Sequence, residues 1–290
     1  MEQLDADFQR DFGELYQRLG PETKDILVGL LPDDWSFDGK RVLDFGCGPG
    51  RTLRHFVGEA ERAEIWGADI NRTSIANLER TLCPPLHALR CEADPPLGLE
   101  YASFDLIWAI SVFTHLTDNS LAWLLELQRL LKPGGLLIAT YIGRGHSELL
   151  AREPWDEDRI GMNVLFHNQG WDRGGPMVLM SDWWVREHWG RAFEVLEIAP
   201  ELHNQSWALM RKRDVELTTR ELERPGSDPR EERALRHNLR QAQREIESTQ
   251  RRAEERVDEA VREYEESLSW RLSRPLRAGA RLARSIRSRR

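Results

Sequence analysis

Two carboxylates placed around a glycine cluster are the residues best suited to chemistry in this chain. The stretch VLDFGCGPG covers residues 42–50 and has the form Asp-x-Gly-x-Gly-x-Gly from Asp44 onward. Glycine permits sharp turns and close approach of a ligand to the backbone. Asp69 follows 19 residues after Gly50, where a carboxylate can accept two hydrogen bonds from a ribose diol. The pattern predicts a nucleoside-binding loop.

A dinucleotide-binding loop is the alternative reading of this glycine cluster. Such loops have the spacing Gly-x-Gly-x-x-Gly. Here position 51, which would have to supply the third glycine, is arginine. The spacing therefore disfavours a nicotinamide-dependent dehydrogenase.

Apolar patterning around the loop predicts alternating strands and helices. Strands are expected at 41–45, 63–70, 86–91, 104–111 and 136–142, and helices at about 50–59, 71–82 and 119–131. A capped helix is expected at 181–190, with Ser181 or Asp182 as the N-cap. Two closing strands, 193–198 and 206–213, are expected to flank a loop at 199–205. This order predicts an α/β domain with a parallel sheet covered on both faces.

With these elements in view, the chain resembles the class I S-adenosylmethionine-dependent methyltransferases. The resemblance covers about 38–212 and rests on five motifs in family order: VLDFGCGPG, GADIN (67–71), CEADPPL (91–97), FDLIWAISVFTHL (104–116) and LKPGGLLIAT (131–140). It implies a Rossmann-like sheet of seven strands with an antiparallel last strand. It also implies S-adenosylmethionine as the cofactor.

The resemblance assigns cofactor-binding roles to ten residues. Asp44, Gly46, Gly48 and Gly50 would hold the amino-acid part of the cofactor. Asp69 would hold the ribose hydroxyls, and Ile70 would flank the adenine. The remaining contacts are implied for the adenine amine and the methionine end: Ala93, Asp94, Ala109 and Ser111.

A general base for methyl transfer to a hydroxyl is predicted at His115. This residue follows the fourth expected strand at its C-terminal end, where open α/β sheets bind ligands. A purely structural role in orienting the loop is equally open. No cluster of residues has metal-ligand spacing, so we expect no metal.

The segment 143–180 interrupts the alternating pattern and is expected to be a substrate-side insertion. Its candidate acceptor-binding residues are His146, Trp155, His167 and Trp171. Indole faces suit sugar rings, and the two tryptophans have aspartates beside them. For the two histidines a surface-loop role is the alternative. Trp183, Trp189 and Trp207 are expected to pack in the core.

Charge divides the chain into an acidic head and a basic remainder. Residues 1–210 hold 19 basic and 33 acidic residues, whereas residues 211–290 hold 22 basic and 16 acidic residues. An acidic head argues against a nucleic-acid substrate. The sequence shows no secretory signal, no apolar run long enough to span a membrane and no disulfide pattern among three cysteines. We therefore expect a cytoplasmic protein.

The chain is predicted to contain the following regions before its last segment. Residues 1–37 form an N-terminal helical lid, 38–213 the methyltransferase domain, 214–227 a linker and 228–274 a long charged helix. Asp228, Pro229 and Glu231 are expected to start this helix with a capping box. Its apolar positions are sparse but step by three or four residues, which predicts a coiled coil within 228–268 and therefore a homo-oligomer. A solitary charged helix is the alternative.

The last segment, 275–290, is predicted as a basic amphipathic tail helix. Residues 269–290 contain eight arginines and no acid, which favours attachment to an anionic membrane surface, on the inner face of the membrane. An acidic partner protein or nucleic acid are the alternatives.

The stretch SLSWRLSRPLR (267–277) resembles a segment found at the ends of bacterial polysaccharide-biosynthesis proteins. The expected function is therefore O-methylation of a sugar in a surface glycan such as O-antigen. The alternatives are methylation of a small metabolite or lipid, and a non-catalytic scaffold that recruits glycan-biosynthesis enzymes.

Overall fold

The computed structural model describes residues 18–151, 155–167, 169–170 and 174–266. It divides the chain into two units, residues 1–238 and 239–290. The predictions for residues 1–17, for Trp171 and for the tail at 269–290 lie outside the described residues, as does the side chain of His146.

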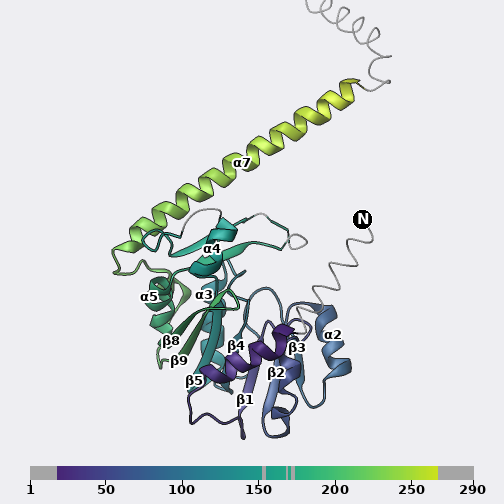
Figure 1. The fold of residues 1–290 in the computed structure, drawn as a ribbon, viewed down its shortest axis with the longest axis vertical. Coiled ribbons are helices and arrows are strands. Elements are labelled where there is room, and N and C mark those ends of the chain that lie inside the picture. Colours follow the sequence, from purple (N-terminus) through teal and green to yellow (C-terminus); the bar gives the residue numbers. More distant parts are fainter. Residues whose placement is uncertain (1–17, 152–154, 168, 171–173, 267–290) are drawn as a thin grey trace, which may run out of the picture. The chain divides into compact units, whose positions relative to one another are not determined.

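Seven strands form one sheet in the order β3-β2-β1-β4-β5-β9-β8 (Figure 1). The strand bounds are β1 Arg41–Phe45, β2 Glu64–Asp69, β3 His87–Arg90, β4 Phe104–Ala109, β5 Leu131–Tyr141, β8 Phe193–Leu202 and β9 Gln205–Lys212. All neighbouring pairs among β1 to β5 are parallel. β9 runs antiparallel to both β5 and β8. The predicted seven-stranded sheet with an antiparallel last strand is confirmed.

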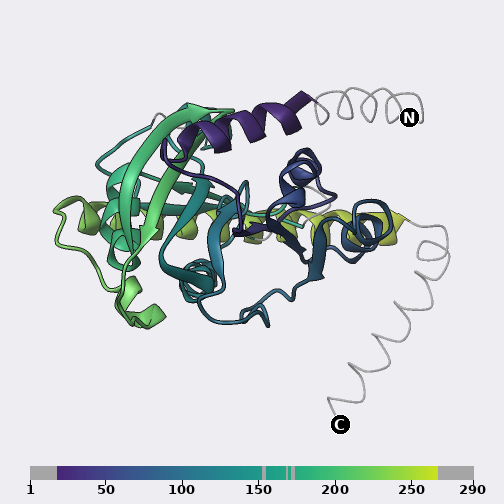
Figure 2. The ribbon, with the colours of Figure 1, turned by 90° about the horizontal axis from the view of Figure 1, so that it is seen from below.

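Helices cover both faces of this sheet (Figure 2). On one face, α3 (Ser120–Leu130) and α5 (Asp182–Ala192) supply apolar side chains that pack against β4 and β5. On the other face lie α2 (Arg72–Thr81), the 3-10 helix η1 (Leu53–Phe56) and a first helix whose described part covers residues 18–30. The predicted cap of α5 is present, because the Ser181 side chain accepts from the Trp184 amide. The Asn71 side chain caps α2 in the same way by accepting from the Ser74 amide.

The prediction of a continuous helix at about 50–59 is wrong. The segment holds η1, and a second 3-10 helix, η2 (Glu59–Glu61), begins at its end. The Thr52 side chain does not cap η1, and Gly58 disfavours continuation of an α-helix. Burial of Leu53 and Phe56 fixes the segment instead.

The loop predicted between the last two strands is also wrong. β8 continues to Leu202 and β9 begins at Gln205, so only two residues form the turn. His203 and Asn204 have φ values of 50° and 61°. Two successive positive φ angles are typical of the tight turn that joins antiparallel strands. The turn was missed because histidine is not a usual residue in its first position.

The insertion contains α4 (Arg144–Ala151) and a two-stranded antiparallel sheet of β6 (Met162–Leu165) and β7 (Met177–Met180). The sheet is attached directly to the end of β5, since the Met180 amide donates to the Ile142 carbonyl over 2.9 Å. The insertion is thus built onto the edge of the main sheet that bears the glycine loop.

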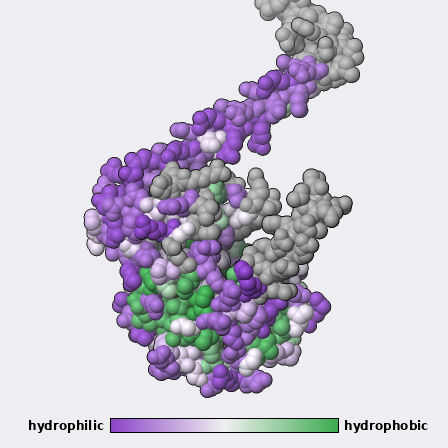
Figure 3. All heavy atoms as spheres, viewed as in Figure 1, coloured by the Kyte–Doolittle hydropathy of each residue, from purple (hydrophilic) through white to green (hydrophobic). Residues whose placement is uncertain are grey.

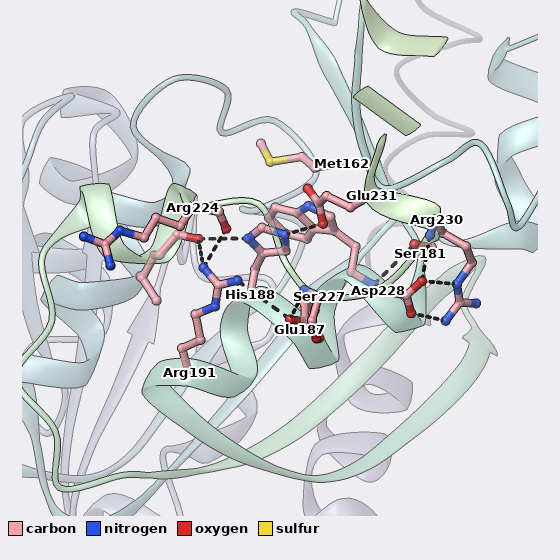
Figure 4. Close-up of polar contacts among 12 residues, drawn as sticks. Met162, Ser181, Glu187, His188, Arg191, Arg224, Ser227, Asp228, Arg230 and Glu231 are labelled. Carbon is pink, nitrogen blue, oxygen red and sulfur yellow. Dashed lines mark hydrogen bonds and ion pairs between the residues drawn. The ribbon is translucent and has the colours of Figure 1, made fainter. Parts of the chain in front are cut away.

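The predicted linker contains a short helix, α6 (Thr219–Glu223), which begins with a capping box between Thr218 and Glu221. Leu222 is fully buried, and its carbonyl accepts hydrogen bonds from His188 and Arg191 of α5 (Figure 4). The segment is therefore packed onto the head rather than a free connection.

The long helix α7 runs from Arg230 to Glu266. Asp228 Oδ1 accepts from the Arg230 amide over 2.9 Å, which supports the predicted start. The predicted capping box is wrong, because the Asp228 carboxylate accepts from the Arg230 amide instead of the Glu231 amide, and the Glu231 carboxylate contacts His188 (Figure 4). The second unit begins at Leu239, and its described part is the remainder of α7, residues 239–266. Within the described residues, no helix is both long and apolar enough to cross a membrane.

Candidate functional site

The glycine loop follows β1 at the carboxyl edge of the parallel strands. The amides of Gly46 and Cys47 both donate to the Ala68 carbonyl, at 2.7 and 3.1 Å. The φ angles of Gly46, Gly48 and Gly50 are 78°, 53° and 81°. Side-chain-bearing residues rarely adopt these angles. The three glycines are thus required by the backbone path, which folds the loop against the end of β2.

The three glycines differ in what surrounds them. A Cβ atom on Gly46 would collide with the Val112 side chain, and one on Gly50 would collide with Leu78. A Cβ atom on Gly48 would have no atom within 4 Å. Gly48 therefore presents its backbone to open space, which is the condition for close approach of a ligand.

Asp69, the last residue of β2, is joined to the glycine loop. Its Oδ2 accepts from the Gly48 amide and its Oδ1 accepts from the Asn71 amide, both at 2.7 Å. Each carboxylate oxygen retains a second lone pair for another donor. The half-buried carboxylate is thus held at the mouth of the loop with acceptor capacity for a diol.

The residues expected at the adenine lie at the ends of β2 and β3. Ile70 is 54% exposed, which fits a side chain that stacks on a planar ring. The Ala93 carbonyl accepts from Asn119 Nδ2 at 2.8 Å and from Trp123 Nε1 at 3.0 Å. Asn119 also donates to Asp94 Oδ1 at 3.1 Å. The loop that carries both residues is thereby pinned to the start of α3.

At the end of β4, Ser111 is held by two residues that the sequence did not reveal, Thr140 and Gln205. Ala109 is buried within the sheet. Ser111 has a φ angle of 60°, and its amide donates to Thr140 Oγ1 over 2.8 Å. Gln205 Nε2 donates to Ser111 Oγ over 2.7 Å. Thr140 and Gln205 therefore fix the unusual backbone of Ser111. Thr140 ends the LKPGGLLIAT motif, and Gln205 belongs to none of the quoted motifs.

Asp44 is the charged group most altered by its surroundings. The residue is only 3% exposed. Burial raises the pKa of its carboxyl to about 7, with a further increase from Asp69 and opposing effects of Trp108 and Arg51. The site therefore holds a carboxyl that is easily ionised by a nearby cation.

His115 lies on the loop after β4, and Nδ1 donates to the Pro176 carbonyl at 2.8 Å. In the same place the Val178 amide donates to the Thr114 carbonyl at 2.8 Å. These contacts tie the insertion to the loop, which supports the structural role. They also assign the Nδ1 proton, since a carbonyl only accepts, and so make Nε2 the nitrogen that can take up a proton.

Two acceptor-binding candidates of the insertion, Trp155 and His167, lie in different surroundings. Trp155 packs against the cluster of Ile142, Ile160, Leu165 and Leu179, and its indole N–H donates to Glu157 Oε2 at 2.7 Å. His167 is exposed. Trp183, Trp189 and Trp207 are at most 6% exposed, which confirms their predicted core role.

The residues at this edge fit S-adenosylmethionine. Gly48 offers an open backbone surface, Asp69 offers acceptors for a ribose diol, and the exposed Ile70 offers an apolar surface for the adenine. The buried Asp44 carboxyl suits the cationic end of the cofactor. In the described residues no group of three or more histidine, cysteine or acidic side chains could hold a metal ion.

Known proteins resemble the same part of the chain. Residues 43–137 match the protein family described as "Methyltransferase domain". The chain is 33% identical over 169 residues to the methyltransferase GfsG of Streptomyces halstedii, covering 48% of this chain and 60% of that protein. It is 31% identical over 125 residues to a malonyl-[acyl-carrier protein] O-methyltransferase of Enterobacter lignolyticus, covering 43% and 47%. The chain thus spans about half the length of the curated relatives it matches.

A solved structure shares the fold. It is the methyltransferase in complex with the Trm112 methyltransferase activator of Haloferax volcanii, with a TM-score of 0.50, 18% identity, and coverage of 75% of this chain and 99% of that chain. The solved structure supports the fold, and the family match supports a methyltransferase domain at residues 43–137.

Proposed function

We propose that this protein is an S-adenosylmethionine-dependent methyltransferase that methylates an oxygen atom of its acceptor. The observation that carries the proposal is the contact between Gly48 and Asp69. The 2.7 Å hydrogen bond holds the carboxylate beside the open side of the loop. An O-methyltransferase among the matched relatives supports an oxygen acceptor.

The chain's own residues act mainly by positioning. The bound cofactor supplies an electrophilic methyl group on a sulfonium, and the acceptor oxygen must approach it in line. Asp69 and the glycine loop orient the cofactor. His115 Nε2 is suited to take the acceptor proton, because the Pro176 carbonyl holds the ring with Nδ1 as the donor.

The acceptor we propose is a sugar hydroxyl of a bacterial surface glycan. The resemblance of residues 267–277 to a segment of polysaccharide-biosynthesis proteins supports this choice. Trp155 supports it too, with an aromatic surface bordered by Asp156 and Glu157. A small carboxylic acid is a second candidate, because the Enterobacter relative is named for a malonyl substrate.

The test is transfer of a radiolabelled methyl group from S-adenosylmethionine to two panels of acceptors. One panel contains nucleotide sugars and lipid-linked oligosaccharides, and the other contains small carboxylic acids. Product that retains label after mild base treatment is an ether, whereas a methyl ester loses it. The proposal predicts base-stable label in the sugar panel. Binding of the cofactor without turnover on either panel would favour the scaffold alternative.

We further propose that residues 269–290 attach the protein to the inner face of an anionic membrane, where lipid-linked glycans are assembled. The support is their charge, since eight arginines occur without an acid.

A further inference from the structure

Ser111 has a left-handed backbone at the carboxyl edge of β4. Its φ angle of 60° lies in a region that is unfavourable for a residue with a side chain. Such a conformation persists only where the surrounding contacts hold it in place, and strained residues of this kind gather at functional sites. The contacts that hold Ser111 are therefore a means by which distant residues can affect the site.

Two polar side chains from other strands hold Ser111. Thr140 is fully buried in β5, and its Oγ1 accepts from the Ser111 amide over 2.8 Å. Gln205 begins β9, around which hydrophobic side chains gather in Figure 3, and its Nε2 donates to Ser111 Oγ over 2.7 Å. Gln205 Oε1 is buried and has no hydrogen-bond partner among the described residues. An unpaired buried oxygen is unfavourable, so stability alone does not account for a glutamine here.

The residue after Ser111 packs on the glycine loop. A Cβ atom on Gly46 would collide with Val112 Cγ2, and two further Val112 atoms would lie within 4 Å of it. The Val112 side chain therefore covers the turn at Gly46 directly. Two residues later in the same loop, the Gly48 amide donates to Asp69 Oδ2. A change in the φ angle of Ser111 would move Val112 away from Gly46 and release this loop.

The same backbone angle directs the turn that carries His115. The Val112 carbonyl accepts from the amides of His115 and Leu116 at 3.0 and 3.3 Å. Val112 thus contacts the glycine loop with its side chain and begins the His115 turn with its carbonyl. The conformation of Ser111 therefore sets the positions of both.

We propose that Thr140 and Gln205 are positioning residues for the cofactor. Thr140 acts through the Ser111 amide and Gln205 through the Ser111 hydroxyl. Together they keep Ser111 left-handed, which keeps Val112 on Gly46 and holds the glycine loop in the shape that receives S-adenosylmethionine. The identity of this ligand rests on the proposed function, whereas the coupling between the two strands and the loop is a property of the ligand-free chain.

Calorimetric titration of the full chain with S-adenosylhomocysteine tests the proposal. Thr140→Val keeps the shape of threonine without its hydroxyl, and it should raise the dissociation constant about tenfold, or about 1.4 kcal/mol. Thr140→Ser keeps the hydroxyl and should restore binding. Gln205→Ala removes the second contact and should raise the dissociation constant about fivefold, so the test does not depend on one variant. The matched control is Thr249→Val at an exposed position of α7, which should bind normally.

A glycine at position 111 distinguishes backbone positioning from a general loss of packing. Glycine adopts positive φ angles readily, so Ser111→Gly removes the need for the two contacts. In that background, Thr140→Val should change the dissociation constant less than twofold relative to Ser111→Gly alone. An equal tenfold loss in both backgrounds would overturn the proposal, as would unchanged affinity of Thr140→Val in the otherwise unmodified chain.

Amide hydrogen exchange of the ligand-free chain measures the loop itself. The Gly48 amide should exchange about tenfold faster in Thr140→Val, and it should regain its slower exchange when Ser111→Gly is added. Unchanged exchange at Gly48 in a chain that binds S-adenosylhomocysteine would overturn this proposal and leave the proposed function standing. An unmodified chain that binds no S-adenosylhomocysteine would instead contradict the proposed function and, with it, the role of both residues in cofactor binding.

Discussion

Glu231 Oε2 lies 3.0 Å from His188 Nε2, with both side chains more than nine-tenths buried (Figure 4). His188 Nδ1 donates to the Leu222 carbonyl at 2.8 Å, and Trp184 stacks on the imidazole ring. With Nδ1 already a donor, a proton must lie between Nε2 and the carboxylate, because two bare acceptors would repel each other. The pair therefore fastens the first turn of α7 to α5 and α6.

Loss of the Glu231 carboxylate should destabilise the head. We expect Glu231→Ala to lower the free energy of unfolding by about 3 kcal/mol, because the buried His188 ring loses its partner. Glu231→Gln should cost less, since its amide can donate to a neutral Nε2. Urea denaturation at neutral pH measures both. Glu232→Ala is the control, because Glu232 is 75% exposed and forms an ion pair with the similarly exposed Arg236, and it should cost under about 0.5 kcal/mol.

Asp69 should determine cofactor affinity. Asp69→Ala removes two expected hydrogen bonds to the ribose and the 2.7 Å contact with the Gly48 amide. The dissociation constant of S-adenosylmethionine, measured by calorimetry, should rise at least tenfold while the circular dichroism stays unchanged. The exposed Glu61→Ala should bind normally. Equal affinities of the Asp69 variant and the unmodified chain would exclude this carboxylate from the site.

Two substitutions of His115 distinguish a role as general base from a structural role. His115→Ala should reduce turnover by roughly 10²–10⁴-fold if Nε2 takes the acceptor proton. His115→Asn keeps a side-chain donor for the Pro176 carbonyl but offers no base. Turnover as low in the asparagine variant as in the alanine variant supports the base. Recovery of turnover in the asparagine variant assigns His115 to positioning the loop. Cofactor affinity should be nearly unchanged in both.

The sheet and the cofactor edge could be predicted because they depend on local patterns. Buried strands read as short apolar runs, and the glycines of the loop are dictated by backbone angles that few other residues adopt. Thr140 and Gln205 could not be found in this way. Their importance comes from contacts with Ser111 across 29 and 94 positions of sequence, and a single polar residue in a strand gives no local signal.

The start of α7 shows a different limit of sequence reasoning. The spacing of Asp228 and Glu231 predicts a capping box, and the helix does begin there. The glutamate nevertheless turns to His188, 43 positions earlier. A buried ring nitrogen is a stronger partner than a solvent-accessible amide, and only the packing of α5 on α7 reveals it.

Membrane attachment should require the arginine-rich end of the chain. The full chain should sediment with liposomes that contain anionic lipid and should be released as salt rises, because each arginine contributes about 1 kcal/mol within a Debye length. A chain ended at Leu268 should stay in the supernatant and keep its methyl transfer to a soluble acceptor. Equal sedimentation of the two chains, or of neither, would contradict the membrane proposal.

The Asp44 carboxyl should make both stability and cofactor affinity depend on pH. Its pKa is raised from 3.8 to about 7 in the folded protein, chiefly by burial. A raised pKa means that the folded state holds the proton more tightly than the unfolded state. Its contribution to stability is therefore full below about pH 4 and is lost as the pH rises to about 7. Asp44→Asn should avoid this loss and be more stable than the unmodified chain at pH 8 without cofactor, by a difference on the order of a few kcal/mol.

Cofactor affinity should change in the opposite direction. A cationic cofactor favours the ionised carboxylate, so the affinity of the unmodified chain for S-adenosylmethionine should increase from pH 6 to pH 8. Near pH 7 binding should release a fraction of a proton, since about half of the Asp44 carboxyls are protonated before binding. Calorimetry in buffers with different ionisation enthalpies measures that release directly. Asp44→Asn should bind more weakly at pH 8 and show no such release. An affinity that is constant from pH 6 to pH 8 in the unmodified chain would show that Asp44 does not interact with the charged end of the cofactor.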